Sequence, residues 1–227
     1  MIHEILFALL GHTGSIIIEL PATLEDLGKN PELRQLCFIV NPNLSFLSAA
    51  EVEQLNKIVQ IGALYKQIQT FVAKYGGINS KLALQLAYKE ELKDGNDSDE
   101  DRQNIDSDMG SGMNDSNEDE QALMGVYIKA FCSGVNEILT VYKQHLLAIE
   151  HEFLRDRALT IAALQLRLAI YEQMFPALNS FMHEIQDKEL IGGQLLDALH
   201  LSCTTGNPVI KNMFTRILFV CNKVLFH

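Results

Sequence analysis

The chain has 227 residues and a formal net charge of −11, from 18 basic and 29 acidic residues. A chain of this length can bury a core large enough to fold without disulfides or metals. Its 48% of hydrophobic and 21% of charged residues exclude a fully disordered or fibrous protein. The acidic balance argues against non-specific binding to nucleic acid or to anionic membranes, because both require a cationic surface.

The first ten residues are mostly apolar, but they include Glu4 and have no basic segment. Their apolar run is too short to predict a signal peptide, and no stretch approaches the ~20 apolar residues of a membrane span. The four cysteines, at positions 37, 132, 203 and 221, are far apart and form no C-x-x-C pair. They predict neither a disulfide framework nor a zinc site, and they favour a reducing compartment such as the cytoplasm.

The first half of the chain contains two short β-prone runs, at 15–20 and 37–40, which are either strands or packed loops. Ser48 and Glu51 have the spacing of a capping box, which begins a helix. Apolar residues then recur at steps of three and four up to Gly76-Gly77, so the pattern predicts a helix over 49–75. A shorter helical pattern follows over 81–93.

Charge is concentrated in one segment, residues 94–120, which contains eleven acidic residues and one basic residue. Its net charge of −10 leaves only −1 for the rest of the chain. The segment is rich in Asp, Asn, Ser and Gly, and it lacks the apolar residues that would offset the entropy of ordering. We expect a disordered acidic insertion at about 94–121.

The second half is predicted to be helical throughout. One stripe of apolar residues at helical spacing runs over 127–153, and a turn is expected at Asp156-Arg157. A helix from Thr160 to about residue 185 contains Pro176, which predicts a kink. A short helix to about Cys203 follows two glycines, and a last helix starts at Asn207-Pro208. The fold class is therefore all-α, an elongated bundle of long helices.

No motif of catalysis, cofactor binding or metal binding is complete. The segment 11–14 lacks the lysine and the spacing of a phosphate loop. His151-Glu152 begins like a zinc-protease helix, but Arg155 stands where the second histidine belongs. Asp197 and His200 are a single i, i+3 pair, which is more typical of a helix surface than of a bundle metal site. We expect no catalytic, cofactor-binding or metal-binding residue, and no enzyme activity.

The acidic segment permits two further hypotheses. Residues 97–108 resemble half of a calcium loop, but Arg102 and Asp108 replace the required glycine and glutamate, so calcium binding is not expected. Ser98 and Ser116 each have an acidic residue three positions later, which suits an acid-directed kinase. Both serines are therefore candidate phosphorylation sites. The simpler interpretation is that the segment is a solvated spacer.

Several segments resemble the N-terminal domain of the gamma-tubulin complex components, most closely the component 4 branch of that family. The similar segments cover the first twenty residues and nearly everything after Leu123, in one order. They are Met1–Leu6, Gly14–Ile16, Gly125–Gly134, Tyr142–Gln144, Glu152–Leu154, Phe175–Pro176, Ile191–Leu196, Ser202–Cys203, Pro208–Val209 and Ile217–Cys221.

The resemblance implies a non-enzymatic scaffold that assembles side by side with sibling components into a template for microtubule nucleation. It implies that the chain is a single N-terminal domain, 1–227, that makes lateral contacts, and that the C-terminal gamma-tubulin-binding domain is absent. Implied partners are the sibling components, with gamma-tubulin reached only through them. Centrosomes, spindle poles and other microtubule organizing centres, in mitosis, are the implied location. No interface residue is implied.

Two other interpretations stay open at this level. The chain could be an all-helical cytosolic adaptor, unrelated to microtubules, whose acidic segment recruits basic partners. It could also be an enzyme with an unusual helical site, which would require a deep pocket with two or more strongly perturbed titratable groups.

Overall fold

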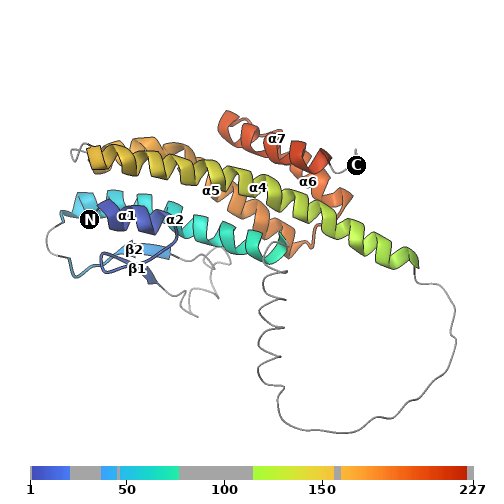
Figure 1. Cartoon of the computed structure of the whole chain (residues 1–227), viewed down its shortest axis with the longest axis horizontal. Coiled ribbons are helices and arrows are strands. Elements are labelled where there is room, and N and C mark those ends of the chain that lie inside the picture. Colours follow the sequence, from blue (N-terminus) through green and yellow to red (C-terminus); the bar gives the residue numbers. More distant parts are fainter. Residues whose placement is uncertain (1, 21–36, 45–46, 77–114, 156–159, 224–227) are drawn as a thin grey trace, which may run out of the picture.

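The computed structural model describes residues 2–20, 37–44, 47–76, 115–155 and 160–223. In the range 115–155, side chains are described from residue 125 onward. These residues form the helices α1 (Ile2–Leu9), α2 (Ala49–Tyr75), α4 (Asp115–Arg155), α5 (Ile161–Asp187), α6 (Gly193–Ser202) and α7 (Pro208–Lys223). Strands β1 (Ile17–Leu20) and β2 (Cys37–Val40) complete the fold. The helices lie along one direction in an elongated bundle (Figure 1). The all-α prediction is confirmed, with one small sheet added.

The predicted helix starts and stops are largely those of the structure. Ser48 caps α2, with its hydroxyl accepting from the Glu51 N–H while the Glu51 carboxylate accepts from the Ser48 N–H, and Gly76 follows the last turn. Thr160 caps α5 with its hydroxyl, which accepts from the Ala163 N–H at 3.2 Å. The Asn207 side chain accepts from the Val209 N–H at 2.9 Å and begins α7. Helix α5 continues through Pro176, and the kink expected there stays a prediction.

Other predictions fall partly or wholly beyond the described residues. The predicted helix over 81–93, the acidic segment up to residue 114 and the turn at 156–157 all lie there. Helix α4 begins at Asp115, inside the expected acidic insertion, and the bounds of that insertion, about 94–121, stay a prediction. The amino-terminal helix α1 was not predicted, since eight residues without a capping signal are too short to show a clear periodicity.

The two β-prone runs pair as an antiparallel ladder, with Ile17 opposite Val40 and Leu20 opposite Cys37. Helix α2 supports this ladder along the outer edge of β2. The Val40 N–H donates to the Asn56 side chain at 2.9 Å, and the Gln60 amide donates to the Phe38 carbonyl at 2.8 Å. Two side chains one turn apart therefore replace the hydrogen bonds of a neighbouring strand.

The described helices share one core, which contains a group of aromatic rings between α2, α4 and α5. Tyr142 of α4 is fully buried, with ring centroids of Tyr65, Tyr171 and Phe175 at 5.3, 4.7 and 4.9 Å. Its hydroxyl donates to the Leu9 carbonyl at 2.9 Å, at the end of α1 where no helical partner remains for that oxygen. Tyr142 thus joins four helices.

Two glycines allow helices to touch. A Cβ atom at Gly62 of α2 would stand 1.9 Å from the Ala8 carbonyl oxygen, so the backbone of α1 rests directly on α2. A Cβ at Gly134 of α4 would stand 3.2 Å from the Ile217 Cα of α7. Gly125, also in α4, has no such neighbour within 4 Å.

We predict that Gly62→Ala lowers the free energy of unfolding by about 3 kcal/mol, the upper end of the cost of overpacking. The new methyl group would force α1 away from α2, because the atoms it meets are backbone atoms. Gly125→Ala is the matched control and should raise stability by up to ~1 kcal/mol, as alanine favours helix. Urea denaturation of both variants measures this, and equal midpoints for the two would contradict the prediction.

We also predict that Tyr142→Phe costs about 1–3 kcal/mol, because it leaves the buried Leu9 carbonyl without a donor while keeping the ring. Tyr171→Phe serves as the comparison. Its hydroxyl lies 3.2 Å from His145 Nδ1 in a half-buried position, so its loss should cost less, about 0.5–1 kcal/mol. Thermal unfolding followed by circular dichroism tests the order, and a larger loss for Tyr171→Phe would refute it.

Candidate interaction surfaces

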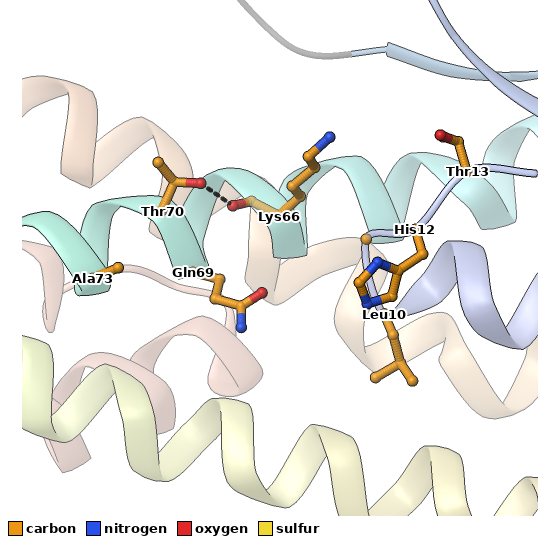
Figure 2. A pocket seen from close by; sticks show the side chains of 8 residues that line it. Leu10, His12, Thr13, Lys66, Gln69, Thr70 and Ala73 are labelled. Carbon is orange, nitrogen blue, oxygen red and sulfur yellow. Dashed lines mark hydrogen bonds between the residues drawn. The ribbon is translucent and has the colours of Figure 1, made fainter. Parts of the chain in front are cut away.

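The hollow between the loop after α1 and helix α2 brings polar groups near one another without directing them at a common point. It has a volume of about 570 Å³ and is lined by His12, Thr13, Lys66, Gln69 and Thr70, among others. The Lys66 amine and the Gln69 amide point in opposite directions, and Thr70 bonds to its own helix (Figure 2). Lys66 pairs instead with Glu19 of β1 at 2.8 Å. This arrangement offers no shared site for a substrate.

The histidines singled out in the sequence lie apart from one another. His151 and Glu152 are exposed on α4, and Glu152 forms an ion pair with Arg167 of α5, which holds the pKa of that carboxyl below its usual value. Asp197 and His200 are both exposed on α6. Within the described ranges, no three His, Cys, Asp or Glu side chains are close enough together to hold a metal ion.

Of the proposed phosphorylation sites, Ser98 is not among the described residues, and Ser116 lies in the first turn of α4. The calcium-like stretch 97–108 is likewise outside the described ranges. Phosphorylation at Ser98 and Ser116 therefore stays a prediction. None of the described helices is long and apolar enough to cross a bilayer.

Glu4 ties the opening helix to the segment that follows it. Its carboxylate accepts from the Ser15 hydroxyl at 3.1 Å and from the Ile16 N–H at 3.0 Å. A Cβ at Gly14 would lie 3.4 Å from the same carboxylate. The two opening segments that resemble the family, Met1–Leu6 and Gly14–Ile16, are therefore one structural unit.

A groove with apolar walls lies where α4, α5 and α7 meet, with a volume of about 300 Å³. We call it the α4–α5–α7 groove. Val141 of α4 is 47% exposed and Ile170 of α5 is 44% exposed, although both are large apolar side chains. The lining residues are Ile138, Val141, Ile170, Tyr171, Met174, Val209, Asn212, Met213 and Arg216. Sequence reasoning missed this groove, because its walls come from three helices whose contacts the stripe patterns do not specify.

A second apolar surface lies on another side of α4 and is called the Leu147 ridge. It comprises Leu147 and Leu154, which are 62% and 61% exposed and two turns apart on one helix face. The nearby Glu150 carboxylate lies 3.9 Å from His3 of α1.

The cysteines provide a test of how the core excludes solvent. Burial raises the pKa of both Cys132 and Cys221 to about 12, so neither is a thiolate at neutral pH. Cys37 and Cys203 are only half-buried.

We predict that iodoacetamide at pH 8 alkylates Cys37 and Cys203 in the native protein and reaches the other two only after unfolding in guanidinium. Peptide mass spectrometry reads this out, and native alkylation of Cys132 as fast as that of Cys203 would contradict it.

Comparison with known proteins gives one consistent result. Residues 2–227 match the family described as gamma tubulin complex component N-terminal. Gamma-tubulin complex component 4 of Arabidopsis thaliana is 25% identical over 232 residues, which cover 100% of this chain and 29% of that protein. The Homo sapiens protein of the same name is 26% identical over all of this chain and 28% of its own length. The Medicago truncatula homolog is 27% identical over all of this chain and 27% of its own length.

The chain thus spans less than a third of the length of these relatives. The matched region extends through every described helix, from α1 to α7, and includes the groove and the ridge. The predicted resemblance is confirmed, and the chain belongs to the gamma tubulin complex component N-terminal family.

Proposed function

We propose that this chain is a non-enzymatic scaffold module that makes lateral contacts between gamma-tubulin complex components and so supports microtubule nucleation. The observation that carries the proposal is the family match over residues 2–227, the whole described fold. A bundle of long helices with one shared core is suited to this role, because it holds its two flanks at a fixed separation.

The described residues support a scaffold better than an enzyme. The hollow beside α2 has side chains that point apart, and the α4–α5–α7 groove is lined mainly by apolar groups. The groups with strongly raised pKa values, Tyr142, Cys132 and Cys221, are buried core residues that face no described pocket opening. Burial in the packed core accounts for these raised pKa values.

The partners of this module are the other gamma-tubulin complex components, with gamma-tubulin reached through them and not through this chain. Nucleic acid and membranes are not partners in this proposal, in keeping with the net charge of −11. The corresponding location is the cytoplasm and cytoskeleton, at the centrosome or another microtubule organizing centre and at the spindle pole.

The test is size-exclusion chromatography of the full chain mixed with the N-terminal domain of another gamma-tubulin complex component. We predict co-elution at high micromolar concentration, because lateral contacts in a multi-subunit template are individually weak and add up through the assembly. Separate elution at that concentration, with both proteins folded by circular dichroism, would refute the lateral role.

The concentrated charge of residues 94–120 favours one second candidate, an adaptor that recruits basic partners. The same chromatography distinguishes the two, using a variant that lacks residues 94–114. The lateral role expects this variant to keep co-eluting with the sibling domain. The adaptor role expects capture of basic proteins that is sensitive to salt and is lost in the variant.

A further inference from the structure

A polar hollow, which we call the α2–α5 pocket, lies between helices α2 and α5 and has a volume of about 280 Å³. Its lining residues begin at Gln67 on α2 and at Asn179 on α5, and on each helix they recur at i, i+3, i+4 and i+7. This is the spacing of a helix face that usually packs into a core with apolar side chains. Here six of the eight lining residues are polar, and only Phe71 and Met182 are apolar. Two facing helices thus present polar groups where packing alone would favour apolar ones.

The amide of Gln67 has no hydrogen bond in this wall. Its Nε2 and Oε1 atoms are both buried, and neither has a partner among the described residues. Native proteins pair nearly all buried polar atoms, because an unpaired one lowers stability. In the described ranges, one other buried side-chain atom is in this state, Oε1 of Glu172, which does not line the pocket. Gln67 therefore has both a donor and an acceptor to offer to a ligand.

The neighbouring polar groups are already held in place. Asn179 is the one buried polar residue in the described part of the chain, with an exposed fraction of 1%, and its Nδ2 lies 3.2 Å from Nε2 of His183. The Thr70 hydroxyl donates to the Lys66 carbonyl at 2.8 Å. Gln67 has no such bond to break, and its side chain has three rotatable bonds. Its amide can therefore turn toward the hollow at little cost.

The charges around the pocket favour a neutral ligand. Its lining residues include one lysine, Lys74, and no acidic residue. Lys74 is exposed, and its amine lies 5.0 Å from the ring centroid of Tyr75. The two deepest polar groups, Gln67 and Asn179, are uncharged amides. An ionic ligand would lose its hydration beside them without gaining an opposite charge.

From these observations we propose that the α2–α5 pocket binds the carboxamide group of a small neutral ligand, through paired hydrogen bonds with the Gln67 amide. A carboxamide has one donor and one acceptor side by side, so two parallel bonds satisfy both free atoms of Gln67. Phe71 and Met182 contact the apolar part of the ligand. The volume of 280 Å³ is several times the ~30 Å³ that one water molecule occupies, so the pocket admits more than solvent.

The experiment is an NMR titration of the ¹⁵N-labelled full chain with benzamide, a flat neutral carboxamide. We expect a saturable shift of the Gln67 side-chain NH₂ signals, with a Kd in the low millimolar range for a ligand of about nine heavy atoms. Acetophenone keeps the ring and the acceptor oxygen but has a methyl group in place of the NH₂. It should bind at least about tenfold more weakly, because it leaves the Gln67 oxygen unpaired.

A carboxamide is carried either by a free small molecule or by the Asn or Gln side chain of a partner. Titration with the peptide N-acetyl-Gly-Gln-Gly, compared with N-acetyl-Gly-Leu-Gly, distinguishes the two sources. A peptide that binds through its glutamine as tightly as benzamide assigns the site to a partner side chain. A peptide that does not bind, when benzamide does, assigns it to a free small molecule.

Variants at Gln67 separate binding from folding. Gln67→Leu should weaken benzamide binding at least about tenfold and leave the melting temperature unchanged or higher, since leucine has no polar atom to leave unpaired. Gln67→Glu keeps the shape but loses the donor, and it should also bind more weakly. Glu172→Gln is the matched control, because it changes the other unpaired buried group away from the pocket, and it should bind benzamide as wild type does.

Three results would overturn the inference. They are no saturable shift up to about 20 mM benzamide, equal affinity for acetophenone, and unchanged benzamide binding by Gln67→Leu. A lower melting temperature of Gln67→Leu together with no benzamide binding by wild type would show that the amide is purely structural. Co-elution with a sibling domain does not depend on this pocket, so the lateral role stands or fails separately.

Discussion

The buried hydroxyl of Tyr142 is the contact on which most of this fold depends. It donates to the carbonyl that ends α1, while its ring fills the space between α2, α4 and α5. Burial holds the pKa of this tyrosine well above its usual value, so the hydroxyl keeps its proton and remains a donor. A single side chain thereby fixes the short first helix relative to three long ones, which share no other polar contact as deeply buried among the described residues.

The structure shows which contacts are made by the segments that resemble the family. Glu4 and the turn around Ser15 form one hydrogen-bonded unit, which joins the two opening segments in space. Gly134, the last residue of the long similar run in α4, allows α7 to approach closely. A motif that is weak on its own becomes informative when its residues meet in space, since packing contacts restrict which side chains fit.

Local signals in the sequence predicted the helix boundaries well and the tertiary contacts poorly. The caps at Ser48, Thr160 and Asn207 are satisfied within a few residues, so the spacing alone reveals them. Helix α1 has no such cap and is stabilised by contact with Gly62, more than fifty positions later. The groove was equally hidden, because Val141 and Ile170 become neighbours only after α4, α5 and α7 come together.

The side chains that line the outer edge of β2 limit association through that edge of the sheet. A strand edge normally presents free backbone groups that invite another strand, which leads to sheet extension or aggregation. Here Asn56 and Gln60 occupy two of those groups, the Val40 N–H and the Phe38 carbonyl, from within the same chain. Association by strand addition is therefore hindered along this edge of the sheet. Under the proposed lateral role, this closes off a less specific route of association.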